Sequence, residues 1–232
     1  MNEPLVHFVN KYGVDVSSVK QIVCGKKYTA VLLKNGNIGV CANLLNQFNA
    51  TIEELNNPDL KKIEHRIVIT AYFNATLNYL NNYDDSVDIF EDINYKKHIN
   101  IVMIGLFKPV LKIFKDKKIK IVVFDMIKKN PQLTPLDEKG VYIKNADLVI
   151  LSATTVFNGT FMEIVKSTGK TSDIFLLGPS SIMNRDMFKY RNIKKIFGSI
   201  FKSHDHKVLD TIKCGQGTRK FLRYGKKVSL QP

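Results

Sequence analysis

Short apolar runs alternate with polar turns along this chain, and near the N-terminus their spacing predicts a small antiparallel sheet. Three β-rich runs lie there, and the turn Lys34–Asn37 between the second and third is typical of a hairpin. The runs are Val19–Cys24, Tyr28–Leu33 and Ile38–Cys41. From about residue 61 to residue 80, apolar positions recur at helical spacing. We therefore expect a small α+β unit.

The pattern then changes to strands that alternate with helices. Short aliphatic runs bounded by turn residues are typical of strands buried on both faces of a parallel sheet. The runs predict strands at 99–104, 119–124, 147–153 and 173–177, a weaker strand at 195–197, and helices near 110–114, 159–167 and 184–190. The predicted fold class is a Rossmann-like, mostly parallel α/β sheet with helices on both faces, preceded by the smaller α+β domain.

The charge distribution supports a division of the chain into two domains. Residues 1–92 hold 8 Lys/Arg against 11 Asp/Glu, a net charge of −3, whereas residues 93–232 hold 27 against 10, a net charge of +17. The acidic segment 83–92 separates these parts and is polar enough to be a connector. We therefore predict domains at 1–92 and 93–232. The basic excess consists of 30 Lys and only 5 Arg in the whole chain, which favours a solvated surface over a nucleic-acid interface.

Composition limits the class of protein. The chain has 232 residues, 44% of them hydrophobic, and its apolar runs are far shorter than the roughly 20 residues that span a bilayer. The N-terminus lacks a basic segment followed by an apolar core, so we expect a cytoplasmic protein without membrane contact. Three widely spaced cysteines, Cys24, Cys41 and Cys214, provide neither a disulfide framework nor a zinc knuckle.

Two polar turns follow buried strands and are the first candidate site. One is Asn158-Gly159-Thr160, and the other is Gly178-Pro179-Ser180 with Ser181 after it. Ligands of open α/β sheets bind outside the carboxyl ends of the strands, where backbone N–H groups and hydroxyls of two such turns can line a crevice. A helix N-cap would also explain the first turn. We expect the two turns to share a small ligand.

A second candidate lies in the first βαβ unit. Gly105-Leu-Phe107-Lys-Pro109 occupies the place of a dinucleotide-binding GxGxxG motif but has one glycine instead of three, which argues against a tight pyrophosphate cradle. The helix N-terminus after it could receive an anion, and a purely structural turn is an equal alternative. Asp125 lies about 20 residues after Gly105, at the position where dinucleotide-binding folds carry the carboxylate that binds a ribose hydroxyl.

The sequence offers one weak metal motif. His204 and His206 would share a face of a strand, with Cys214 as a third ligand. If the segment is helical, the two imidazoles point apart, and a solvated polar stretch is the better interpretation. No catalytic triad or paired-carboxylate arrangement can be assembled from spacing alone.

These motifs, in this order and spacing, resemble a known family. Residues from about 95 to 230 are similar to the "putative heavy-metal chelation" domain family, which has a Rossmann-like fold. The resemblance rests on Gly105–Pro109, Asp125, the run Asp147–Thr154 with its asparagine turn, and the turn at Gly178. Members often carry an N-terminal domain similar to the N-terminal domain of enolase. The signatures of that domain are similar to two segments of this chain, Cys24–Val31 and Tyr72–Ala75.

The resemblance implies a two-domain protein with its site in the cleft between the domains, where the ligand is a heavy metal or a metal chelate. We expect a small anionic ligand between Asn74 of the first domain and the Asn158 and Gly178 turns. The alternative is an enzyme with a nucleotide-like cofactor such as S-adenosylmethionine in the same cleft. The sequence leaves two alternatives open: the protein either catalyses a reaction or only binds its ligand, and the chain is either a monomer or a homo-oligomer.

Overall fold

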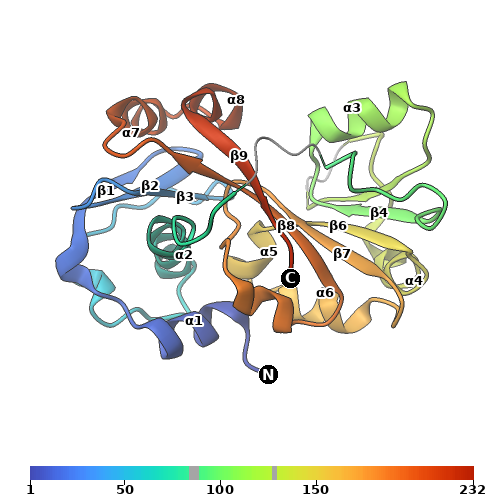
Figure 1. The fold of residues 1–232 in the computed structure, drawn as a ribbon, viewed down its shortest axis with the longest axis horizontal. Coiled ribbons are helices and arrows are strands. Elements are labelled where there is room, and N and C mark those ends of the chain that lie inside the picture. Colours follow the sequence, from blue (N-terminus) through green and yellow to red (C-terminus); the bar gives the residue numbers. More distant parts are fainter. Residues whose placement is uncertain (84–88, 127–129) are drawn as a thin grey trace.

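The computed structural model describes residues 1–83, 89–126 and 130–232 and contains two β-sheets (Figure 1). The smaller sheet is antiparallel and has the order β1-β2-β3. Its strands are β1 (Val19–Cys24), β2 (Tyr28–Leu33) and β3 (Ile38–Ala42), accompanied by the helices α1 (Pro4–Tyr12) and α2 (Ile63–Leu77) and the 3₁₀ turns η1 (Val16–Ser18) and η2 (Glu53–Leu55). The predicted antiparallel sheet and the helix after it are confirmed.

Helix α2 is buried on almost all sides because it packs between the two parts of the protein. One side lies on β2 and β3, and another contacts α5 (Thr154–Phe157) of the second part. The close approach to β3 depends on Gly39, where a Cβ atom would lie under 3.0 Å from Ala71 O and Ala75 N. Apolar residues around the whole circumference are the pattern expected of a helix covered in this way.

The larger sheet has the order β5-β4-β6-β7-β8-β9, and all its strands except the edge strand β9 are parallel. The strands are β4 (Ile101–Ile104), β5 (Val122–Phe124), β6 (Leu148–Ser152), β7 (Asp173–Leu177), β8 (Ile193–Phe201) and β9 (Gly225–Leu230). The helices are α3 (Lys108–Asp116), α4 (Lys139–Lys144), α5, α6 (Phe161–Ser167), α7 (His206–Lys213) and α8 (Thr218–Phe221), with the 3₁₀ turns η3 (Leu136–Glu138), η4 (Arg185–Lys189) and η5 (Leu222–Tyr224).

Helices cover both faces of this sheet. On one face, Leu111 and Phe114 of α3 share a core with Phe175 and Phe197. On the other face, the apolar side chains of α4, α5 and α6 pack on the sheet in a core that continues into α2 and the small sheet. The α/β class with a mostly parallel sheet and a smaller antiparallel sheet is thus confirmed.

Several elements differ from the sequence prediction. The predicted helix 184–190 is a 3₁₀ turn, η4, and the weak strand at 195–197 is the nine-residue strand β8. The predicted strand 119–124 is ordered as β5 only from Val122. Helices α1, α4, α5, α7 and α8 and strand β9 were not predicted. The predicted boundary between residues 92 and 93 remains a prediction, since residues 84–88 of the acidic connector lie outside the described part of the chain.

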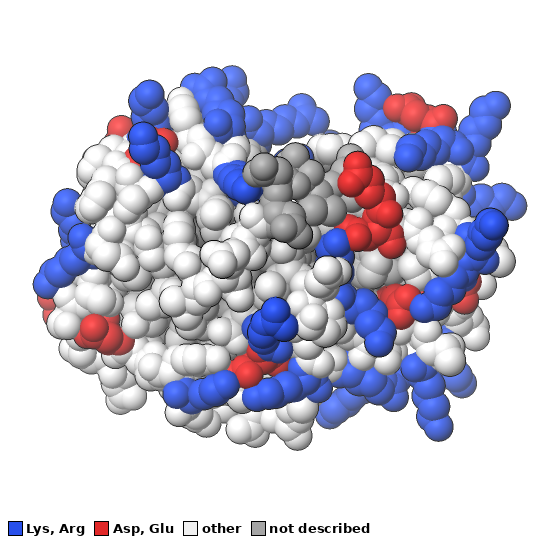
Figure 2. All heavy atoms as spheres, viewed as in Figure 1, with Lys and Arg blue, Asp and Glu red and all other residues white. Residues whose placement is uncertain are grey.

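Charged side chains gather over particular elements. On the face drawn in Figure 2, Lys and Arg side chains project from the regions of α3, α7 and α8, whereas much of the centre is uncharged.

Among the described residues, no helix is both long and apolar enough to span a membrane.

Asp186 joins α1 to η4 through a buried carboxylate. It accepts hydrogen bonds from Lys11 Nζ (2.6 Å), His7 Nε2 (2.9 Å) and Tyr12 OH (3.0 Å), and Lys189 Nζ lies 2.7 Å away. Burial alone would raise the pKa of this carboxyl, but the hydrogen bonds from Lys11, Lys189, His7 and Tyr12 outweigh burial and hold the pKa well below its ordinary value of 3.8.

Because the pKa of Asp186 is lower in the folded state than in the unfolded state, its stabilisation is complete above about pH 4 and is lost as pH falls toward the folded-state value. We expect Asp186→Asn to lower the free energy of unfolding at pH 7 by about 1 to 3 kcal/mol. The difference from the wild type should shrink at pH 3. Urea denaturation at both pH values measures the difference in free energy of unfolding between the wild type and the variant. A difference independent of pH would show that the Asp186 charge does not stabilise the fold.

Candidate functional site at the carboxyl edge of the large sheet

The order of the strands marks one position on the large sheet. The chain proceeds from β4 to β5 on one side and then returns to β6 on the other side of β4. Connections therefore leave the carboxyl ends of β4 and β6 in opposite directions, and open α/β sheets bind their ligands at such a switch point. This places the candidate site at the turns that follow β4 and β6.

The turn after β4 approaches the end of β6 closely. Gly105 has φ +96°, and a Cβ atom there would lie 2.7 Å from the Cβ of Ser152. Both the backbone conformation and this contact require glycine. The Gly105 amide donates to Phe124 O (2.8 Å), and the next amide, that of Leu106, donates to Asp125 Oδ2 (2.6 Å). Asp125 thus holds the turn after β4 against the end of β5.

Phe107 brings the turn after β7 to the same place. Its half-buried ring lies 3.8 Å from the Cβ position of Gly178, and Ala153 Cβ lies 3.9 Å from that position. Gly178 has φ +134°, which favours glycine. The turns after β4, β6 and β7 therefore meet, and the structure brings together the predicted residues Gly105, Phe107, Asp125 and Gly178.

Two hydroxyls at this position were not among the residues predicted from the sequence. Ser152 is the last residue of β6, its Oγ lies 2.9 Å from Thr154 Oγ1, and Ser152 is the residue that Gly105 approaches. Thr154 is half-buried. The sequence carries a signal for them, because these two residues lie at the end of the apolar run 147–154.

The rest of the Gly178 turn joins the two sheets. Ser180 Oγ accepts a hydrogen bond from Ala42 N (3.0 Å), and Ser181 Oγ donates to Phe197 O (2.8 Å). Asn74 Nδ2 donates to Val40 O (2.8 Å) and to Pro179 O (3.4 Å). Asn74 Oδ1 is buried and accepts no hydrogen bond from the residues that the structure describes. The hydroxyl oxygen of Ser180 and the amide NH₂ of Asn74 thus take part in the joint between the sheets, and the role of these two residues in ligand binding stays a prediction.

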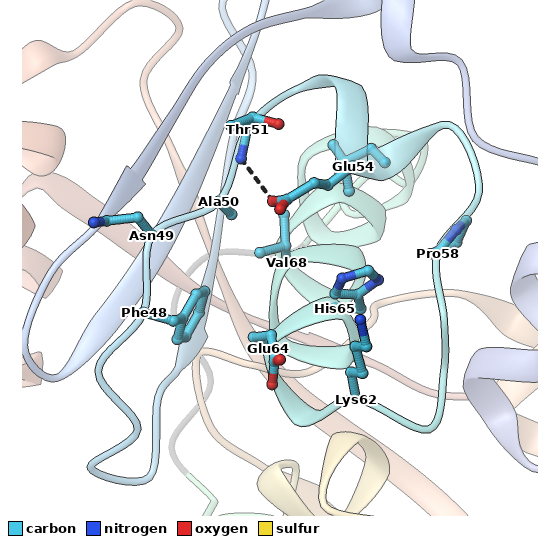
Figure 3. Close-up of a pocket in the computed structure, with 11 residues that line it drawn as sticks. Phe48, Asn49, Ala50, Thr51, Glu54, Pro58, Lys62, Glu64, His65 and Val68 are labelled. Atoms are coloured by element: carbon cyan, nitrogen blue, oxygen red, sulfur yellow. Dashed lines mark hydrogen bonds between the residues drawn. The ribbon is translucent and has the colours of Figure 1, made fainter.

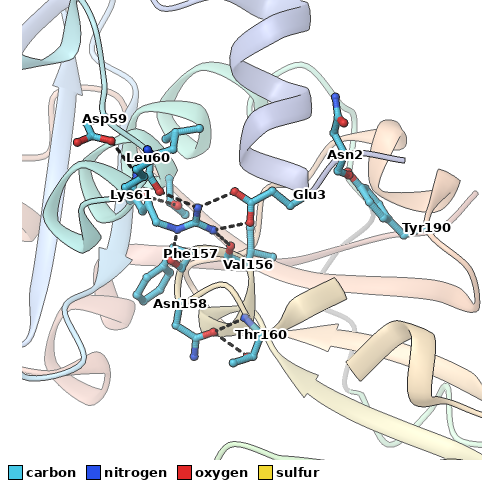
Figure 4. Close-up of polar contacts among 12 residues, drawn as sticks. Asn2, Glu3, Asp59, Leu60, Lys61, Val156, Phe157, Asn158, Thr160 and Tyr190 are labelled. Carbon is cyan, nitrogen blue, oxygen red and sulfur yellow. Dashed lines mark hydrogen bonds and ion pairs between the residues drawn. The ribbon is translucent and has the colours of Figure 1, made fainter. Parts of the chain in front are cut away.

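The turn Asn158-Gly159-Thr160 lies beyond α5 and begins α6. Asn158 Oδ1 accepts hydrogen bonds from Thr160 N (3.0 Å) and Thr160 Oγ1 (2.7 Å), as Figure 4 shows. Gly159 has φ +83° and open space around its Cβ position. Within the described residues, no hydrogen bond joins this turn to Gly105, Phe107 or Gly178. Local capping accounts for the observed contacts of Asn158, and its role in ligand binding stays a prediction.

The described residues do not supply a direct metal site. No three His, Cys, Asp or Glu side chains among them are grouped so that they could hold one ion. His206 begins α7 and Cys214 follows its end, so the two are about 12 Å apart along the helix. His204 lies on the Asn35–Gly36 turn, to which its amide donates. The sequence motif of these three residues therefore does not form a metal centre.

Two cavities lie away from this edge. One of about 180 Å³, lined by Glu54, Glu64 and His65 among others, separates the segment 48–58 from the start of α2 (Figure 3). His65 Nδ1 accepts a hydrogen bond from Asp59 N (2.9 Å). The other, of about 270 Å³, lies beside Tyr190. Neither is lined by a residue predicted from the sequence.

Family models match nearly the whole chain. Residues 10–85 match one model and residues 88–231 match another, and both are described as "Putative heavy-metal chelation". No curated protein matches the chain.

Two solved structures have a similar fold. A protein of unknown function from the DUF364 family of Pyrococcus horikoshii is 21% identical, with a TM-score of 0.78 over 92% of this chain and 93% of that chain. A protein of the same family from Desulfitobacterium hafniense DCB-2, also of unknown function, is 16% identical, with a TM-score of 0.76 over 98% of this chain and 96% of that chain. At these identities the likeness shows the fold.

Proposed function

Because this chain belongs to the family described as "Putative heavy-metal chelation", we propose that it binds a metal as a chelate, through the anionic organic ligand. The proposed binding site is the carboxyl edge of the large sheet, where the turns after β4, β6 and β7 meet beside the small sheet. The ligand would lie against the turns at Gly105 and Gly178, with Phe107 and Thr154 at its sides.

The contact between the three turns is the observation that carries this proposal. Gly105 lets the turn after β4 pack against Ser152, and at Gly178 only Phe107 and Ala153 lie near the Cβ position, at 3.8 to 3.9 Å, so no side chain of its own covers that backbone. The hydroxyl pair of Ser152 and Thr154 offers hydrogen bonds, and the half-buried ring of Phe107 offers an apolar wall. An apolar group beside a few polar groups is the combination that orients a small ligand in proteins.

The available donor groups favour a chelate over a bare ion. Soft heavy metals prefer thiolate and imidazole ligands. At this edge the described side chains offer hydroxyls and the carboxylate of Asp125, which already accepts the Leu106 amide. The organic ligand would therefore coordinate the metal, while the protein binds the oxygen atoms of that ligand.

Thr154→Val tests the site with little change in shape. We expect this variant to bind Ni²⁺–citrate at least about tenfold more weakly than the wild type in equilibrium dialysis, because a hydroxyl that contacts the ligand is replaced by a methyl group. Thr76→Val is the matched control, since its hydroxyl bonds to Tyr72 O within α2. Equal affinities of wild type, variant and control would contradict the proposed site. Retention of an adenosine compound in place of the chelate would instead favour the nucleotide-cofactor alternative.

A further inference from the structure

Strand β8 carries a serine past the end of β7 and beside the proposed site. Phe197 of β8 pairs with Leu177, the last residue of β7, and Phe197 O accepts the amide of Gly178 (3.1 Å). Ser199 therefore lies two residues beyond the end of β7, level with the turn that begins at Gly178. Neither the motifs nor the family resemblance included this residue.

The side chain of Ser199 points to the face of the sheet on which Phe107 packs. At Gly198, a Cβ atom would meet Met183 Sδ (2.6 Å), on the opposite face. Successive side chains of a strand point to opposite faces. Ser199 therefore shares its face with Phe197, whose core cluster also contains Phe107.

The Ser199 hydroxyl has no partner in the described part of the protein. The residue is 95% buried, and its Oγ makes no hydrogen bond there. The neighbouring hydroxyls of Ser152, Ser180 and Ser181 are all hydrogen-bonded. A buried hydroxyl without a partner is unfavourable unless something else bonds to it, so its presence at this position calls for an explanation.

A lysine stands directly opposite this serine on the neighbouring strand. In the antiparallel register of β8 and β9, Ser199 pairs with Lys227, so their Cβ atoms lie about 5 Å apart on the same face. Lys227 is exposed, and among the residues described it forms no ion pair. A buried serine and an exposed lysine are thus cross-strand neighbours at the level of the Gly178 turn.

We infer that Ser199 and Lys227 bind an oxyanion of the ligand, a carboxylate or phosphate group, at the β8–β9 end of the proposed site. The inference rests on the proposed function and deepens it by naming the groups that select an anion. Lys227 neutralises the charge of the oxyanion, and the Ser199 O–H donates a hydrogen bond to it. Hydrogen bonds between such donors and a charged oxygen are stronger than those between neutral groups.

The test uses Ser199→Ala and Lys227→Gln with two probes, citrate and inorganic phosphate, titrated calorimetrically at low salt. Each variant should bind the better probe at least about tenfold more weakly than the wild type. Lys194→Gln is the charge-matched control for Lys227→Gln, because Lys194 is an exposed lysine of β8, the strand of Ser199, near the end of β8 that lies away from the Gly178 turn. Ser199→Ala should melt no lower than the wild type, since its Oγ has no hydrogen bond to lose.

The outcomes separate this inference from the proposed function. If Thr154→Val weakens binding while Ser199→Ala and Lys227→Gln bind like the wild type, the inference is wrong and the proposed site stands. If Lys194→Gln weakens binding as much as Lys227→Gln, only net charge matters, which also overturns the inference. A wild-type protein that binds neither probe contradicts the anion site itself and the inference with it.

Discussion

Replacing Gly39 by alanine is expected to lower the free energy of unfolding by more than about 3 kcal/mol, beyond the usual cost of overpacking a core. The Cβ atom would enter the backbone of α2 at Ala71 and Ala75, where no flexible side chain can yield. The helix would have to move away from β3. Because α2 also contacts α5, and Asn74 of α2 donates to Pro179 O, that movement would also disturb the joint with the Gly178 turn.

Chemical denaturation of Gly39→Ala measures this effect, and Gly140→Ala is the control. Gly140 lies in α4 with no atom within 4 Å of its Cβ position, so alanine there should leave stability unchanged or raise it by up to about 1 kcal/mol. If both variants were as stable as the wild type, the close packing of α2 on β3 would be wrong.

Arg66→Met is expected to cost about 3 to 5 kcal/mol of stability, the typical loss when one member of a buried ion pair is removed. The guanidinium forms a two-point ion pair with the Glu3 carboxylate (2.6 and 2.9 Å) and donates to Val156 O (2.9 Å) and Phe157 O (2.5 Å). Its partners Glu3, Val156 and Phe157 are labelled in Figure 4. It also donates to Leu60 O (3.1 Å). One side chain therefore links the start of α1, the loop before α2, and α5.

The conservative variant Arg66→Lys separates charge from geometry. An ammonium group keeps the positive charge but cannot reproduce the planar fork, so we expect a loss smaller than that of Arg66→Met but clearly measurable. Arg185→Lys, at an exposed position, serves as the control and should be neutral. Thermal unfolding of Arg66→Met, Arg66→Lys and Arg185→Lys measures the stability of each variant relative to the wild type. An Arg66→Lys variant as stable as the wild type would show that charge alone accounts for the role of Arg66.

The strands were predictable because their signal is local. Val19–Cys24 and Asp173–Leu177 are β-rich or aliphatic runs bounded by turn residues, and each forms a strand at the predicted place. Helix α4 and strand β9 carry weak local signals, since a short helix and a lysine-rich edge strand depend on the sheet they pack against. The predicted helix at 184–190 became a 3₁₀ turn, with its N-cap Asn184 bonded to the amide of Asp186.

The site was predictable only to the level of turns. Parallel strands bring their carboxyl ends to one edge, so Gly105 and Gly178 could be expected to lie near each other. Which polar groups remain available there depends on tertiary contacts. The sequence cannot show that Ser180 bonds to Ala42, or that the Ser199 hydroxyl bonds to none of the described residues, because these facts depend on the register of β8 and on the joint with the small sheet.

The most direct test of the central claim is native mass spectrometry with elemental analysis of the protein purified without chelators. The account predicts a stoichiometric metal together with the mass of an organic anion, both released on denaturation and both lost in Thr154→Val. Retention of a stoichiometric metal with no organic partner would contradict the account, because it would require a direct metal site that the described residues do not provide.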